Sequence, residues 1–268
     1  CTEVDGVPSG VTAGPVCDTA EVLCVGTPDI EIIKRVRDPA TSNWVDANTP
    51  PGPTYPVGAV VEYQLEVCNI GTLDLVDVEV FDPDLNIPPT SIGALAVGQC
   101  VILEQGVGPV TGLDTTIPCS EQRQFENVAF ADGFPIGGLD PVQDNDPANV
   151  ICVPPELRVT KDGDPEDKAG DTVSYDVCAY NDSSTVALTA CEATDTLPGV
   201  TLPAPFDLAT GASFCWSYDY MIPADFPGTQ VDNTATVECN VVGVDPASVA
   251  GSISASDDWT VPLFEMEG

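Results

Sequence analysis

The chain has 268 residues, of which 43 are acidic and 7 are basic, and its formal net charge is −36. Such a charge repels nucleic acid and anionic membranes, so neither is an expected partner, and no apolar run suggests membrane insertion. Histidine is absent, which removes the usual general base and triad member, and no Walker, dinucleotide-binding or Gly-x-Ser-x-Gly motif occurs. We therefore expect no enzyme activity.

The patterned segments of the chain predict strands rather than helices. Apolar and polar residues alternate over 61–67, which is typical of a half-buried strand, and no long segment has helical periodicity. A loop containing prolines is expected between 82 and 95. Strands are predicted, in chain order, over 29–36 (A), 60–68 (B), 75–81 (C), 100–104 (E), 125–131 (F) and 148–153 (G), and the second half is expected to repeat them.

The same pattern then repeats. VVEYQLEVCNIG, LAVGQC and NVAFADG in the first half correspond to TVSYDVCAYND, LATGAS and NTATVEC in the second. The period is roughly 110 residues, the size of one sandwich domain. We predict an all-β chain of tandem Ig-like β-sandwich domains at 28–154 and 155–268, joined by a stiff Pro154-Pro155 linker.

Residues 1–27 match the end of both modules and are predicted to be a partial domain, an F–G hairpin. One interpretation is that the chain is a segment of a longer repetitive protein. Another is that the hairpin pairs with a neighbouring subunit, because a lone hairpin is marginally stable. A lipid-modified Cys1 is a further alternative, although Cys1 aligns with strand residue Cys239.

The strings KDGDPEDKAGDTVSYDV, ATDTLPGVTL, LATGASFCW and NTATVEC resemble the Ig-like surface-repeat family, domains of unknown function in bacterial, archaeal and algal cell-surface proteins. The resemblance covers both modules and the partial one. The first module departs from it at 82–85 and 127–130. It implies an Ig-like sandwich and a structural or adhesive role, with no catalytic residues.

Eleven cysteines and no Cys-x-x-Cys motif favour disulfides, and hence an oxidising, extracellular compartment. The resemblance to surface repeats implies that the location is the cell surface. Strands B and E are antiparallel neighbours in an Ig-like sandwich, as are C and F, and F and G. The alternative is that the cysteines are free buried thiols. Cys24 is expected to pair upstream of this sequence. The predicted pairs are Cys68–Cys100, Cys178–Cys215, Cys191–Cys239, Cys119–Cys152 and Cys1–Cys17.

Other candidate sites are less specific. Clustered oxygens suggest calcium, the one candidate cofactor, although no EF-hand loop is present and acidic residues are ordinary in loops. Asn181-Asp182-Ser183 is a glycosylation sequon in a turn expected to be exposed. Lys34, Arg35 and Arg37 form a basic cluster that either docks on an acidic neighbour or is a solvated strand face. The candidate calcium ligands are Asp162, Asp164, Glu166, Asp144 and Asp146.

A Lys–Asn isopeptide bond is a further alternative, and it requires a buried lysine; Lys34 and Lys161 lie on or beside the first strand of each module. The expected function is a structural subunit or segment of an extracellular filament, stalk or fibre that self-assembles or forms homo-oligomers. The alternative is an adhesin that binds a glycan or protein. An adhesin favours clustered exposed aromatics, whereas Trp44, Tyr55 and Trp259 are scattered.

Overall fold

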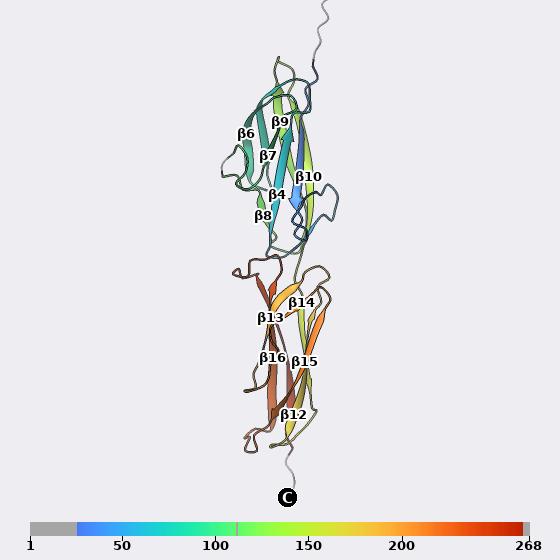
Figure 1. Cartoon of the computed structure of the whole chain (residues 1–268), viewed down its shortest axis with the longest axis vertical. Coiled ribbons are helices and arrows are strands. Elements are labelled where there is room, and N and C mark those ends of the chain that lie inside the picture. The colour runs from blue at the N-terminus through green and yellow to red at the C-terminus, as the bar shows by residue number, and fades with distance from the viewer. Residues whose placement is uncertain (1–25, 111, 265–268) are drawn as a thin grey trace, which may run out of the picture.

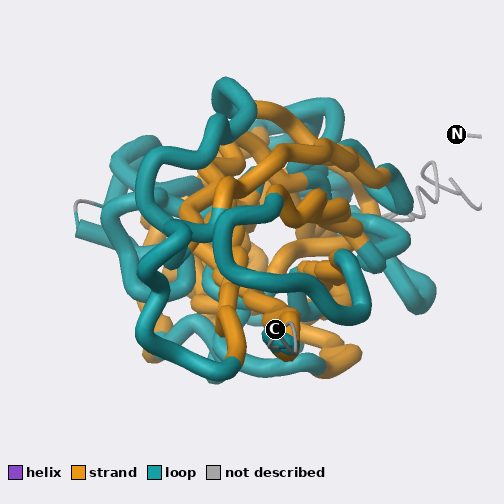
Figure 2. The backbone as a smooth tube through the Cα atoms, turned by 90° about the horizontal axis from the view of Figure 1, so that it is seen from below, coloured by secondary structure: helices purple, strands orange, loops and turns teal. Residues whose placement is uncertain are grey.

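The computed structural model describes residues 26–110 and 112–264, and these residues form strands and loops only. The all-β prediction is therefore confirmed. The described residues include no helix that is long and apolar enough to cross a membrane. Figure 1 shows two groups of strands arranged end to end along the long axis, and Figure 2 shows the strands gathered centrally with loops around them. We call these groups the N-terminal unit (26–153) and the C-terminal unit (157–264).

The N-terminal unit has two five-stranded sheets. One has the order β2-β1-β4-β7, with β8 also pairing with β4, and the other has the order β3-β10-β9-β5-β6. Its strands are β1 (Glu31–Arg37), β2 (Trp44–Asp46), β3 (Thr54–Pro56), β4 (Val60–Cys68), β5 (Leu75–Asp82), β6 (Ile87–Leu95), β7 (Cys100–Leu103), β8 (Thr116–Pro118), β9 (Arg123–Pro135) and β10 (Val142–Val153).

The C-terminal unit has sheets of order β11-β12-β15 and β14-β13-β16-β17. Among the described residues, no strand pairing joins the two units. Its strands are β11 (Leu157–Gly163), β12 (Thr172–Asn181), β13 (Leu188–Asp195), β14 (Phe206–Leu208), β15 (Ser213–Met221), β16 (Gln230–Val241) and β17 (Ser252–Pro262).

Alternation explains how each sheet acquires one apolar face. In β12, Val173, Tyr175, Val177 and Ala179 are fully buried, while the residues between them are exposed or half-buried. Successive side chains of a strand point to opposite faces, so these four face the opposing sheet. The arrangement of two sheets over a shared apolar core is consistent with a β-sandwich.

Aspartates help to join the two sheets of each unit along one edge. The carboxylates of Asp144 and Asp146 on β10 accept hydrogen bonds from the backbone N–H groups of Ile32 (2.9 Å) and Lys34 (2.7 Å) on β1. In the C-terminal unit the carboxylate of Asp257 accepts one from Lys161 N–H, at 2.8 Å. These bonds satisfy edge groups of β1 and β11 that would otherwise be open to pairing with another chain.

The expected loop between 82 and 95 is partly wrong, because β6 occupies Ile87–Leu95. This segment contains Pro88 and Pro89, which cannot donate to a ladder, and prolines are tolerated mainly on edge strands. β6 is an edge strand, and its pairing with β5 has three register shifts. The three-residue strands β2, β3 and β8 were also not predicted.

Candidate functional site

The strongest candidate site in the N-terminal unit is a charged pair inside the core. Lys34 occupies a buried position of β1 between Ile32 and Val36, so its side chain faces the opposing sheet. Its ammonium group contacts the carboxylate of Asp82, at the end of β5. Both side chains have zero solvent exposure. The predicted basic cluster is therefore wrong for Lys34, which is not a surface residue.

The pair is electrostatically costly. Burial lowers the pKa of Lys34 to about 8, because desolvation disfavours the ammonium form more strongly than Asp82 stabilises it through its charge and hydrogen bond. Replacing a buried ion pair by apolar residues of similar volume is often neutral or stabilising. Stability alone therefore gives little reason for Lys34 and Asp82 to be inside this core.

An asparagine lies beside this pair without hydrogen-bond partners. The register of β5 and β9 pairs Phe81 with Phe130, so Asp82 is opposite Ala129 and shares a sheet face with Asn127, two residues further along. Asn127 has zero exposure, and neither its amide oxygen nor its amide nitrogen has a partner. Buried polar groups are normally paired, so an amide with both atoms unpaired requires an explanation.

The C-terminal unit contains the same three residue types. The Nζ atom of Lys161 on β11 lies 2.9 Å from a carboxylate oxygen of Asp195 at the end of β13, and both side chains are fully buried. Burial lowers the pKa of Lys161, an effect opposed by its hydrogen bond to Asp195. Asn233 on β16 is 1% exposed.

A tyrosine hydroxyl joins the three residues of the C-terminal unit. The Oη atom of Tyr218 accepts hydrogen bonds from Lys161 Nζ and, at 3.0 Å, from Asn233 Nδ2, and it donates to the carboxylate of Asp195. The lysine, aspartate and asparagine therefore lie around a single atom. The amide oxygen of Asn233 accepts a bond from Thr196, 3.2 Å away.

Strand register shows that the two sets are structurally equivalent. Asp195 is opposite Ala235 on β16, and Asn233 precedes Ala235 by two residues. In the N-terminal unit, Asn127 precedes Ala129 by two residues in the same way. Two positions after Lys34 the strand pairs with Tyr63, and two positions after Lys161 it pairs with Tyr175. Each lysine Nζ lies 4.8 Å from the centre of that tyrosine ring. We call Lys34, Asp82 and Asn127, and likewise Lys161, Asp195 and Asn233, the buried triads.

Disulfides supply two covalent links in each unit, and the prediction of disulfides is confirmed. Cys68–Cys100 and Cys178–Cys215 lie on the outer faces of their sheets, with Cys100 and Cys215 exposed. Cys119–Cys152 and Cys191–Cys239 are buried. Four disulfides indicate a secreted or extracellular protein. The predicted Cys1–Cys17 pair and Cys24 lie outside the described residues.

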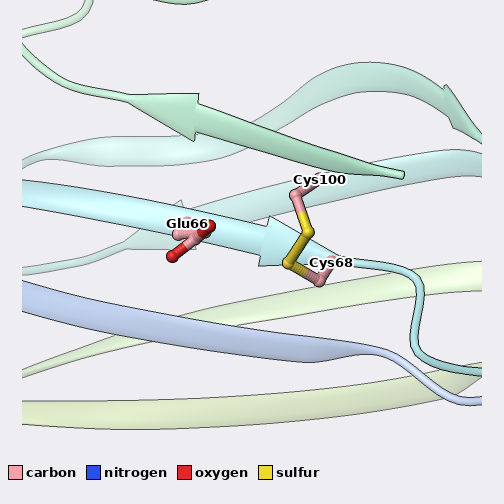
Figure 3. Close-up of side chains that lie close together, drawn as sticks. All are labelled: Glu66, Cys68 and Cys100. Carbon is pink, nitrogen blue, oxygen red and sulfur yellow. A yellow bond between two sulfur atoms is a disulfide. The ribbon is translucent and has the colours of Figure 1, made fainter. Parts of the chain in front are cut away.

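Neither of the two predicted groups of calcium ligands, at 144–146 and at 162–166, brings three side-chain ligand atoms close together in the described residues. The carboxylates of Asp144 and Asp146 are occupied by the backbone of β1, and Asp164 accepts a bond from Ser174 N–H. Within residues 26–110 and 112–264, the only group of three potential ligand atoms lying close together is Glu66, Cys68 and Cys100. Figure 3 shows these two sulfurs joined as a disulfide, which leaves no thiolate to bind a metal.

The expected exposure of Asn181 is wrong. This side chain is 1% exposed, and its Nδ2 atom donates to the carbonyls of Val186 (2.9 Å), Leu208 (3.1 Å) and Ala209 (3.2 Å). A glycan would have to be attached at that same nitrogen. Asn69 makes the corresponding bonds to Leu73 and Leu95. The sequon residue therefore has a structural role in the folded unit.

The remaining surface features are dispersed. Arg35 and Arg37 pair with Glu66 (2.7 Å) and Glu62 (3.5 Å) of the neighbouring strand rather than forming a free basic patch. Tyr55 is buried, and Trp259 donates to the carbonyl of Asp164, 3.1 Å away. Three surface hollows have volumes of 140, 170 and 150 Å³, below the several hundred Å³ of typical small-ligand pockets.

Comparison with known proteins does not assign the chain to a family. No protein-family model and no curated protein sequence matches it. Among solved structures, red sea bream transglutaminase aligns with 91% of this chain at 11% identity and a TM-score of 0.28, and a Porphyromonas gingivalis W83 protein of unknown function aligns with 83% at 11% identity and a TM-score of 0.27. Salmonella alpha-2-macroglobulin aligns with 78% at 10% identity and a TM-score of 0.30. The chain covers 32%, 98% and 16% of those proteins, respectively.

Proposed function

We propose that the chain is a load-bearing segment of an extracellular filament, stalk or fibre at a cell surface, built from tandem Ig-like modules. The observation that carries this proposal is the path of the chain. The described residues begin at the far end of the N-terminal unit and finish at the opposite end of the C-terminal unit (Figure 1). A pull applied at the two ends would therefore pass through both units in series.

The internal links support the same proposal. Each unit has two disulfides, and the connection between the units is only three residues long, with two of them prolines. Prolines restrict backbone freedom and make a short linker semi-rigid. A series of cross-linked units joined by stiff linkers suits a spacer better than a catalyst.

Electron microscopy of the native cell-surface material tests this proposal. We expect fibres or stalks that an antibody against residues 155–268 labels along their length, with self-association of the same chain as the partner interaction. Label confined to isolated single molecules, with the purified chain remaining monomeric at all concentrations, would contradict the filament proposal.

A further inference from the structure

We propose that each unit contains an intramolecular isopeptide bond, joining Lys34 to Asn127 in the N-terminal unit and Lys161 to Asn233 in the C-terminal unit, with Asp82 and Asp195 as the proton-transferring groups. The sequence raised this bond only as an alternative. The geometry of the buried triads now points to it. The inference stands independently of the filament proposal, since it concerns chemistry within one unit.

The first argument is the state of the two reacting groups. Lys34 is fully buried, with its Nζ atom against the carboxylate of Asp82 and 4.8 Å from the Tyr63 ring centre. Desolvation favours the neutral, nucleophilic amine, and a lowered pKa is one way in which lysine nucleophiles are activated. Asn127 supplies a buried amide carbon whose oxygen and nitrogen make no competing hydrogen bonds.

The second argument is proximity. Lys161 Nζ and Asn233 Nδ2 both hydrogen-bond to the hydroxyl of Tyr218, so the amine and the amide are held around one atom with the Asp195 carboxylate at the same place. Holding two reactants together in the right geometry can give effective molarities of about 10⁵–10⁸ M, so an amide that is inert to amines in solution can react here.

The third argument is repetition. The two units differ at most positions, yet both place a lysine on the first strand, an aspartate at the end of β5 or β13, and an asparagine on β9 or β16 at the same register. A buried ion pair often stabilises a core no more than apolar residues of similar volume would. A shared reaction explains why all three residue types occur together in both cores.

The reaction balances without an oxidant or a cofactor. A proton moves from the Lys34 ammonium to the Asp82 carboxylate, and the neutral Nζ attacks Cγ of Asn127 to form a new C–N bond. Asp82 then gives its proton to Nδ2 and takes one from Nζ. The Cγ–Nδ2 bond breaks, and ammonia leaves. The product is a secondary amide beside a protonated Asp82, and both groups are neutral.

The test is the mass of the intact chain after reduction and alkylation of its cysteines. Each isopeptide bond removes one ammonia, about 17 Da, so the expected deficit is about 34 Da relative to the sequence. Digestion should yield two cross-linked peptide pairs, one joining Lys34 to Asn127 and the other joining Lys161 to Asn233. A mass equal to that of the unlinked sequence, or a deficit without linked peptides, overturns the proposal; one linked pair alone overturns it for the other unit.

Variants separate the roles of the three residues. Asp82→Ala and Asn127→Ala should each remove the Lys34 link, leaving a deficit of about 17 Da from the C-terminal unit, whereas Asp84→Ala, at an exposed neighbouring position, should retain both links. Asn127→Ala keeps the ion pair, so it remains informative if Asp82→Ala fails to fold. Loss of the Lys34 link in Asp84→Ala, or its persistence in Asp82→Ala, would contradict the assigned role of Asp82.

Discussion

Asn69 and Asn181 show how one side chain can fix a turn in each unit. The Nδ2 atom of Asn181 donates to the carbonyls of residue 186, in the loop after β12, and of residues 208 and 209, at the end of β14. Removing a donor from buried acceptors costs the desolvation free energy of those acceptors as well as the hydrogen bonds. The conserved geometry of the two asparagines therefore stabilises each unit.

We expect Asn181→Ala to lower the free energy of unfolding by about 2–3 kcal/mol, because it leaves buried carbonyls unsatisfied. Chemical denaturation of the purified chain measures this change. Ser184→Ala, at an exposed position of the same turn, is the matched control and should change stability by less than about 0.5 kcal/mol. Equal effects of the two substitutions would show that Asn181 does not fix the turn.

The pH dependence of stability should reveal whether Lys34 is free. Its pKa in the folded, unlinked chain is about 8, below the value of 10.5 for an unfolded lysine. Between these values the unfolded chain binds more protons, so stability rises with pH. The Asn127→Ala variant, which cannot form the bond, should therefore gain stability from about pH 8 to 10 at up to about 1.4 kcal/mol per pH unit.

The linked chain has no ionisable Lys34 amine and should lack this contribution. Denaturation at a series of pH values, comparing Asn127→Ala with the unsubstituted chain, measures the difference. Matching slopes in the two proteins would mean either that Lys34 titrates in both or that it titrates in neither.

At the scale of elements, the two disulfides of the C-terminal unit differ in what they link. Cys178–Cys215 joins β12 to β15 on an outer face, whereas Cys191–Cys239 joins β13 to β16 with both cysteines at most 1% exposed. The disulfides close loops of 37 and 48 residues. Removing either one would therefore raise the conformational entropy of the unfolded chain by a similar amount.

We expect Cys178→Ala/Cys215→Ala to cost about 3–4 kcal/mol of stability, and Cys191→Ala/Cys239→Ala to cost about 1–2 kcal/mol more, because the second pair also leaves a cavity in the core. Thermal denaturation of the two double variants, each otherwise fully oxidised, gives the comparison. A smaller effect for the buried pair would argue against the core position of Cys191 and Cys239.

The principal strands were predictable because they carry a local signal. β4 begins and ends at the predicted residues, since its alternating apolar residues are recorded in the sequence. β6 was missed because its prolines indicate a loop, and only pairing along the edge of β5 makes the segment a strand. β2, β3 and β8 are three residues long, too short to show a periodicity.

At the scale of the whole molecule, the isopeptide bonds would change how force passes through the chain. A pull at the N-terminal end of the described residues reaches β1 first, and a bond from Lys34 to Asn127 would transfer it directly to β9. The residues between them would then carry no load. This would add to the restraint provided by Cys68–Cys100 and Cys119–Cys152.

Single-molecule stretching in reducing buffer tests this expectation. Unfolding of the N-terminal unit in the Asp82→Ala variant should release the segment from 34 to 127, an extra length on the order of 300 Å relative to the linked chain. The Asp84→Ala variant should behave as the unsubstituted chain does. The same unfolding length in all three proteins would mean that no covalent bond shields this segment.

The sequence by itself determined the all-β character, the repeated pattern and the four cysteine pairs of the described residues, because alternation, turn residues and cysteine phase are local properties of the chain. The sequence did not determine that Lys34 and Lys161 face the core, because a lysine on an alternating strand is normally expected to be exposed to solvent. Only the packing of the two sheets brings Asp82, which is far from Lys34 in the sequence, against the buried Lys34 amine. Only the register of β5 and β9 places Asn127 on the same sheet face as Asp82. Burial and proximity, and therefore the chemistry proposed for the triads, depend on contacts that the order of residues along a strand does not contain.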